Sequence, residues 1–94
     1  MALARVVEFE GVTNERIEQL RQEIGESGRP DEIPATEMMI LHDPDAGKSL
    51  AIVLFDNEED YRRGDAALSA MPAGNTPGGR RSVNKYTVAI RVQG

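Results

Sequence analysis

The chain has 94 residues, a formal net charge of −5 and no cysteine. A chain of this length predicts one domain covering residues 1–94. Without cysteine it can form neither a disulfide framework nor a thiolate metal site, and its acidity argues against nucleic acid, because phosphate binding needs a basic face. The longest apolar run, residues 50–55, is too short to span a membrane, and the N-terminus lacks a signal-peptide pattern. We therefore expect a cytoplasmic protein without membrane association.

The first two elements are a strand and a helix. Residues 4–9 (ARVVEF) predict a strand that places Arg5, Val7 and Phe9 on one face. A helix follows, capped by Thr13 or Asn14, and it should end near Gly25 or Gly28. Its apolar residues recur at spacings of three and four, which predicts one narrow buried stripe: Ile17, Leu20 and Ile24.

Residues 36–42 and 50–55 predict two antiparallel strands joined by a turn at residues 43–47. Both strands are apolar on both faces, whereas a sheet with one face in water should alternate apolar and polar residues. Helices can cover only one of these faces. The pattern therefore predicts a homodimer that forms through the other face of the sheet.

A second helix should begin with Asp56 as its cap and Glu59 reaching back in a capping box. Its inward stripe is predicted to contain Tyr61, Ala67, Leu68 and Met71, and Pro72 should end it. Gly64 inside this helix has two interpretations: a close approach of the helix to the sheet, or a locally weak helix.

Residues 82–92 alternate regularly and predict the last strand. The element order is therefore β-α-β-β-α-β. This order is typical of the ferredoxin-like fold of the α+β class, a four-stranded antiparallel sheet with both helices on one face.

Two apparent motifs fail on their context. Gly47, Lys48 and Ser49 look like the end of a phosphate loop, but His42 occupies the position of the required glycine and a strand follows instead of a helix. An EF-hand calcium loop starting at Asp43 would need glycine and glutamate where Lys48 and Leu54 stand. We expect no metal site, because His42 is the only histidine.

A small-molecule pocket between helices and sheet would be lined by Met38, Tyr61, Met71 and Tyr86. For proton transfer the candidates are His42, Tyr61 and Tyr86. The alternative for each of these side chains is ordinary core packing or, for His42, a solvated or hydrogen-bonded position at a strand end.

The element order, the phrase GKSLAIVLFDNEEDYRRGDAAL and the ending NKYTVAIRV resemble the dimeric α/β-barrel superfamily, and within it the antibiotic biosynthesis monooxygenase-like proteins. The resemblance implies two sheets packed across a two-fold axis with the helices outside. Members of this group generally place Asn, Trp or His in the pocket, whereas this chain has no tryptophan, and His42 is not on the second helix, where a haem ligand would be expected. We therefore expect no cofactor.

Three functions follow as alternatives. The first is a small homodimeric protein that binds a small apolar ligand between helices and sheet. The second is a cofactor-independent monooxygenase or isomerase acting on an aromatic or polyketide-like substrate. The third is a purely structural dimerisation module. The residues alone do not decide whether the protein is an enzyme.

Overall fold

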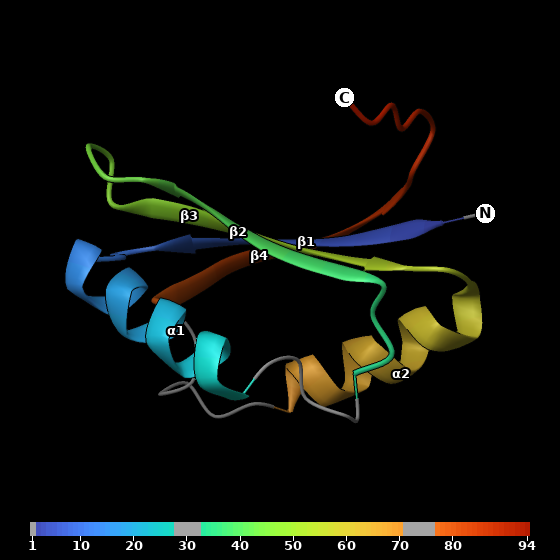
Figure 1. Cartoon of the computed structure of the whole chain (residues 1–94), viewed down its shortest axis with the longest axis horizontal. Coiled ribbons are helices and arrows are strands. Elements are labelled where there is room, and N and C mark those ends of the chain that lie inside the picture. Colours follow the sequence, from blue (N-terminus) through green and yellow to red (C-terminus); the bar gives the residue numbers. More distant parts are fainter. Residues whose placement is uncertain (1, 28–32, 71–76) are drawn as a thin grey trace.

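The computed structural model describes residues 2–27, 33–70 and 77–94 and confirms the β-α-β-β-α-β order (Figure 1). Met71 and Pro72, predicted at the end of the second helix, lie outside the described residues. The elements are β1 (Leu3–Glu10), α1 (Asn14–Ser27), β2 (Glu37–Asp43), β3 (Lys48–Phe55), α2 (Glu58–Ser69) and β4 (Gly79–Thr87). The strands form one antiparallel sheet in the order β2-β3-β1-β4. The fold is therefore ferredoxin-like, as predicted.

Both helices lie on one side of the sheet, and no described helix covers the other side (Figure 1). On the covered side, which we call the helix face, Arg5, Val7 and Phe9 of β1 are buried. The register places Val6 of β1 beside Ile52 of β3, and Ile52 beside Met39 of β2, on the opposite side. We call this side the open face; it carries Val6, Glu8, Met39, Leu41, Leu50, Ile52, Leu54 and Tyr86.

The core under α2 is the better packed half of the helix face. Phe55 at the end of β3 and Tyr61 of α2 meet edge to face, with ring centroids 5.4 Å apart. The same cluster contains Ile33, Ala35, Val53 and Leu68. Complete burial of a side chain such as Phe55 contributes about 1.5–3 kcal/mol. A second cluster of Val7, Phe9 and Val12 contacts α1 through Ile17. Leu20 of the predicted stripe is buried as well, but Ile24 remains 48% exposed, so α1 is less well covered near its C-terminal end.

The two helix starts differ in how well they were predicted. Thr13 caps α1, because its hydroxyl accepts a hydrogen bond from the backbone N–H of Arg16 at 3.1 Å. The predicted cap of α2 was wrong by one residue: the cap is Asn57, whose side-chain oxygen accepts from the N–H of Asp60 at 2.8 Å. Asp60 therefore takes the capping-box place predicted for Glu59, and its carboxylate accepts from Asn57 Nδ2 at 3.3 Å.

The predicted turn between β2 and β3 forms at residues 43–47. Gly47 has φ 65°, a left-handed conformation that favours glycine, and its N–H donates to the carbonyl of Asp43 at 3.0 Å. The carboxylate of Asp43 accepts from the N–H groups of Asp45 and Ala46. Asp43 and Asp45 thus belong to a turn, as the sequence indicates.

The predicted end of the last strand was wrong. β4 stops at Thr87, although the alternating pattern continues to Val92. Thr87 pairs with Leu3, the first residue of β1, and one further hydrogen bond joins the N–H of Val88 to the carbonyl of Ala2 at 2.9 Å. β1 begins at Leu3, so among the described residues β4 has no further strand residue of β1 to pair with. The strand ends because its neighbour ends.

Candidate functional site

A hollow of about 420 Å³ lies on the open face, at the end of the sheet where β2 turns into β3. Three neighbouring strands line it. Their contributing residues are Glu8 of β1, Leu41, His42 and Asp43 of β2, and Lys48, Ser49 and Leu50 of β3. The register places Leu41 beside Leu50 and Leu50 beside Glu8, so the floor of the hollow is one row across the sheet.

His42 does not point its imidazole into this hollow, because successive strand residues point to opposite faces and Leu41 occupies the open face. Its Nδ1 lies 2.8 Å from Ser49 Oγ, and its Nε2 lies 2.9 Å from Asn14 Oδ1 at the start of α1. Since an amide oxygen only accepts, Nε2 donates to Asn14, and in the neutral ring Nδ1 accepts from the Ser49 hydroxyl.

This Ser-His-Asn arrangement has the residue types of a nucleophilic triad, but Ser49 is only 2% exposed. A nucleophile must reach the reacting carbon, and Ser49 presents almost no surface from which it could do so. The arrangement instead ties the β2–β3 hairpin to the first turn of α1, and this role matches the hydrogen-bonded strand-end interpretation of His42.

The polar side chains that do face the hollow are Glu8, Asp43 and Lys48. Asp43 is engaged by the turn, as described above. Within the described part of the chain, neither Glu8 nor Lys48 has a side-chain hydrogen bond or ion pair. The hollow therefore combines a leucine floor with one acidic and one basic side chain, a lining that suits a small, mostly apolar molecule with a polar end.

Tyr61 lies on the helix face, away from this hollow. Besides its contact with Phe55, its ring has Lys85 Nζ 4.8 Å from its centroid, and Lys85 also contacts both carboxylate oxygens of Glu58, at 2.6 and 2.7 Å. Burial, and secondarily the charge of Asp65, raises the pKa of Tyr61 above its ordinary value. Its phenol therefore stays protonated at neutral pH and is engaged in packing.

The remaining predicted site residues do not gather in one place. Met38 shares the helix face with His42, whereas Tyr86 pairs with Ala4 on the open face and is 54% exposed. Met71 lies outside the described residues. The described members of the predicted pocket are thus divided between the two sides of the sheet.

Sequence reasoning did not assign a role to Arg5, which is 3% exposed beneath α2. Its Nε donates to Asp65 Oδ1 at 2.8 Å, and its Nη2 donates to Ser69 Oγ at 3.4 Å. The available signal was a charged residue on the same strand face as Val7 and Phe9, since a buried cation needs a partner. Among the described residues, no group of three or more His, Cys, Asp or Glu side chains could hold a metal ion.

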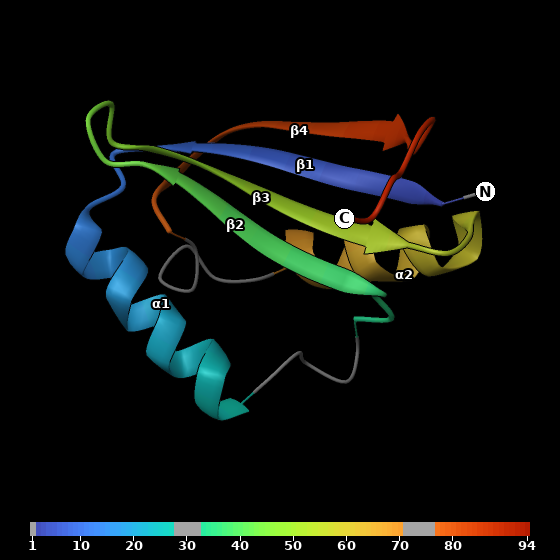
Figure 2. The same ribbon diagram turned by 45° about the horizontal axis from the view of Figure 1, so that its top comes forward.

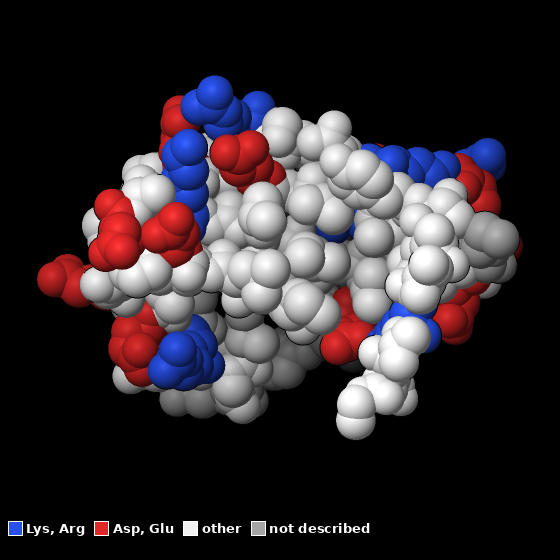
Figure 3. Space-filling model, turned by 90° about the horizontal axis from the view of Figure 1, so that it is seen from above, with Lys and Arg blue, Asp and Glu red and all other residues white. Residues whose placement is uncertain are grey.

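The open face as a whole carries several exposed apolar side chains. Leu41 is 49% exposed, and Met39, Leu50 and Tyr86 on the same face are exposed as well. Figure 3 looks onto this face and shows uncharged side chains across its middle, with Lys, Arg, Asp and Glu gathered toward its two ends. A continuous apolar surface bordered by charges is typical of a protein-protein interface. Neither described helix has the length and apolar content of a membrane span.

The comparison with solved structures identifies the fold. The chain is similar to the crystal structure of a "putative Antibiotic biosynthesis monooxygenase" from Chloroflexus aurantiacus J-10-fl, with a TM-score of 0.59 and 12% sequence identity. The match covers 100% of this chain and 98% of the other. The chain has the fold of an antibiotic biosynthesis monooxygenase-like protein. The resemblance noted in the sequence is thereby confirmed at the level of the fold. No protein-family model and no curated protein matches the sequence.

Proposed function

We propose that the protein is a homodimer in which the open faces of two sheets pack against each other. The observation that carries this proposal is the exposed apolar surface of Met39, Leu41, Leu50 and Tyr86 on the side of the sheet that no described helix covers. Stacked sheets pack about 10 Å apart through interdigitating side chains, and a stable interface buries roughly 800 Å² on each partner. A second copy supplies the matching apolar surface.

We propose further that this dimer binds a small, mostly apolar ligand in the hollow beside Leu41 and Leu50. The hollow lies on the open face, so a second sheet packed there would close it from above. Ligand sites usually bury most of the ligand, and the single sheet leaves this hollow open to solvent on one side. A ligand site on the helix face around Tyr61 has less support, because Phe55 and Lys85 already contact the ring of Tyr61.

The dimer is tested with a variant of the open face and a matched control. Leu50→Glu places a charge on the proposed interface and should give the mass of a single chain by light scattering, with unchanged circular dichroism. Ile24→Glu adds the same charge at an exposed apolar position of α1, on the other side of the sheet. It should leave the dimer intact. A dimer that resists Leu50→Glu would place the interface elsewhere.

Ligand binding has its own readout. We expect 1-anilinonaphthalene-8-sulfonate, a dye with apolar rings and one anionic group, to bind the native dimer and to lose affinity in Leu41→Ala. Met38→Ala on the helix face serves as the control and should bind the dye as the native protein does. Equal affinity in all three proteins would contradict a ligand site in the hollow and leave a purely structural dimerisation module.

A second candidate is a cofactor-independent monooxygenase or isomerase acting on an aromatic or polyketide-like substrate. The structurally similar protein is named as an antibiotic biosynthesis monooxygenase, and this similarity supports the second candidate. The candidates for positioning or proton transfer are His42, Tyr61 and Tyr86, which one chain does not bring together. Oxygen consumption with a panel of dihydroxy-aromatic compounds tests this candidate, with His42→Ala as the comparison. Turnover that His42→Ala abolishes would support it, and absence of turnover throughout the panel would count against it.

A further inference from the structure

Two oppositely charged side chains of the hollow, those of Glu8 and Lys48, have no partner within the described part of the chain. Glu8 lies half-buried on the inner strand β1, and Lys48 lies exposed at the beginning of β3. The register pairs Glu8 with Leu50, so Lys48, two residues before Leu50, is a diagonal neighbour of Glu8 on the open face. Diagonal neighbours on antiparallel strands are roughly 7–8 Å apart. An acid and a base thus lie close together, and no contact neutralises either of them.

The acidic groups directly beside Lys48 are engaged elsewhere. Glu10 is the register neighbour of Lys48 on β1, but its carboxylate accepts a hydrogen bond from Arg81 Nη1 at 3.1 Å. Asp43 is the register neighbour on β2, and its carboxylate accepts from the N–H groups of its own turn. The ammonium group of Lys48 is therefore available to a ligand, as is the carboxylate of Glu8.

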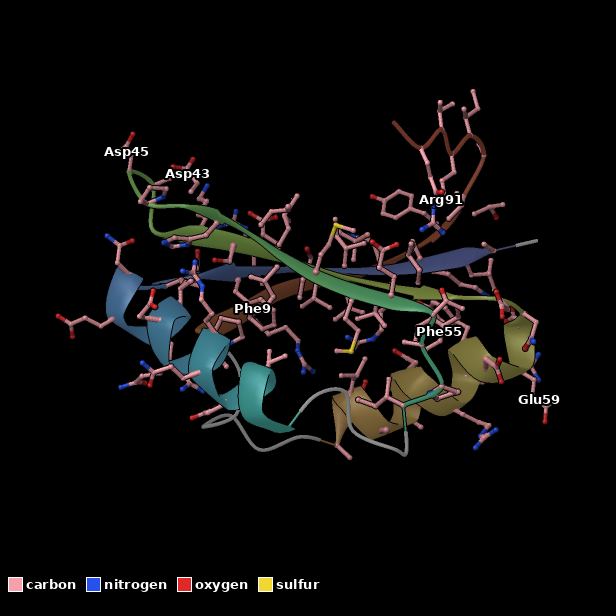
Figure 4. The ribbon with its side chains drawn as sticks, in the orientation of Figure 1. Phe9, Asp43, Asp45, Phe55, Glu59 and Arg91 are labelled. Carbon is pink, nitrogen blue, oxygen red and sulfur yellow. The ribbon has the colours of Figure 1, made fainter. Side chains whose placement is uncertain are left out.

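The end of the chain leaves this part of the open face uncovered. Figure 2 shows β2, β3 and β1 side by side, with the C-terminus over the half of the sheet away from the β2–β3 turn. Arg91 lies at that other end, where its guanidinium group pairs with the carboxylate of Glu37, whereas Asp43 lies at the turn (Figure 4). Among the described residues that line the hollow, Lys48 is the one cation.

We propose that the hollow binds a small carboxylic acid with an apolar tail and with a hydrogen-bond donor, a hydroxyl or an ammonium group, on the carbon next to the carboxylate. This inference rests on the proposed ligand site and adds the chemical class of its ligand. Lys48 Nζ donates to the carboxylate of the ligand, and the carboxylate of Glu8 accepts from the donor group. The tail lies on Leu41 and Leu50, which form the floor of the hollow.

The spacing of Glu8 and Lys48 requires the two polar groups of the ligand to be close together. Strand side chains stand roughly perpendicular to the sheet, so the ends of these two begin roughly 7–8 Å apart. Each charge-assisted hydrogen bond takes up about 2.8 Å of this distance. The few ångströms that remain match two groups on adjacent carbon atoms, whereas groups at opposite ends of an aromatic ring are too far apart.

Charge favours a ligand with both groups over a ligand with one. A simple carboxylate would gain the contact with Lys48 but would bring a negative charge close to Glu8. A simple amine would gain the contact with Glu8 but would bring a positive charge close to Lys48. Like charges at such short range repel each other. An exposed ion pair contributes little, so the ligand loses little by separating Glu8 from Lys48.

The experiment uses four compounds that share one branched apolar tail and differ in their polar groups. L-Leucine carries the carboxylate and an ammonium group, and 2-hydroxy-4-methylpentanoate carries the carboxylate and a hydroxyl. 4-Methylpentanoate carries the carboxylate alone, and 3-methylbutylamine carries the ammonium group alone. Each is titrated into isotope-labelled native protein, and its affinity is read from the amide signals of Glu8, Lys48 and Leu50. We expect the first two to bind roughly threefold to tenfold more tightly than the last two.

Two variants assign the two contacts separately. Lys48→Met should abolish the advantage of L-leucine over 3-methylbutylamine, because the carboxylate loses its partner. Glu8→Gln should abolish the advantage of L-leucine over 4-methylpentanoate, because the ammonium group loses its partner. Arg63→Met and Glu59→Gln remove the same charges from exposed positions of α2 and should leave all four affinities unchanged. The amide spectra also show whether each variant is folded.

The outcomes separate the class of ligand from the site itself. Equal affinity of the native protein for all four compounds would overturn the class, and the hollow would stand as a site if the anilinonaphthalene dye still loses affinity in Leu41→Ala. If the dye binds equally to both proteins, the proposed ligand site falls as well. If Glu8→Gln and Lys48→Met weaken the dimer but do not change the order of the four affinities, the two side chains serve contact between copies and the inference is wrong.

Discussion

Gly64 of α2 lies directly against the ring of Phe55 at the end of β3. A Cβ atom added at Gly64 would lie 2.2 Å from Cε1 and 2.3 Å from Cζ of that ring, closer than non-bonded carbon atoms approach. Phe55 is completely buried and its ring packs against Tyr61, so an added atom would have to displace the ring within the core. Of the two interpretations that the sequence left open, the close approach of helix and sheet is confirmed.

Gly64→Ala should therefore destabilise the protein, although alanine is the better helix former. Overpacking of a filled core costs typically 1–3 kcal/mol, and the helix gains back roughly 1 kcal/mol. We expect a net loss of up to about 2 kcal/mol in the free energy of unfolding, measured by urea denaturation followed by circular dichroism. Gly25→Ala is the control, because nothing lies within 4 Å of a Cβ added there. It should stabilise α1, and a gain of stability in both variants would contradict the packing described.

The stability of the protein should depend on the ion pair between the buried Arg5 and Asp65. Asp65→Asn removes the charge that Arg5 faces at 2.8 Å, and an unpaired buried cation is costly. We expect a loss of about 1–3 kcal/mol, moderated because Asp65 is partly exposed. Arg5→Met removes the cation and keeps an apolar side chain of similar length, so it should destabilise less than Asp65→Asn. Urea denaturation of both variants decides the order, and the reverse order would show that Arg5 acts chiefly through packing.

Glu58 should make stability depend on pH in the acidic range. The hydrogen bond from Lys85 is the main cause that holds the pKa of Glu58 below its ordinary value. Desolvation, the next largest effect, opposes it, and the charges of Lys85 and Arg62 lower the pKa further. The unfolded chain therefore binds a proton at a higher pH than the native protein does. The stabilisation is present above pH 4.5 and is lost as the pH falls through the native pKa.

The comparison is between the native protein and Glu58→Gln, with urea midpoints measured from pH 7 to pH 3. The variant should be less stable at pH 7, and the difference should shrink as the pH falls. Glu59→Gln, the next residue along α2, serves as the control, because no ion pair of its carboxylate occurs in the described part of the chain. A difference that is constant with pH would show that the contact with Lys85 has no electrostatic part.

Much of the fold could be predicted because the deciding signals are local. The alternation in β1, the turn at Gly47 and the apolar hairpin each depend on residues close together in sequence. The cap of α2 was predicted one residue too early because Asp56 and Asn57 are both favoured N-cap residues. Which of them caps the helix depends on the backbone conformation of the chain after β3. β4 was predicted too long because its end is set by Leu3, about eighty residues away in the chain.

The candidate site was harder to predict because it depends on which face of the sheet each side chain occupies. Met38 and Tyr86 were predicted in one pocket, but the register places them on opposite faces. The row from Glu8 through Leu50 to Leu41 involves three strands, and no single stretch of sequence contains it. The pairing of Arg5 with Asp65 could not be predicted either, because the two residues are 60 positions apart and only the fold brings them together.

The mass of the native protein in solution tests the central claim most directly. Sedimentation equilibrium over a range of micromolar concentrations measures it without labels or substitutions. We predict twice the 10.3 kDa of one chain, with dissociation only at the lowest concentrations. A constant mass of 10.3 kDa throughout would contradict a dimer formed by the open faces.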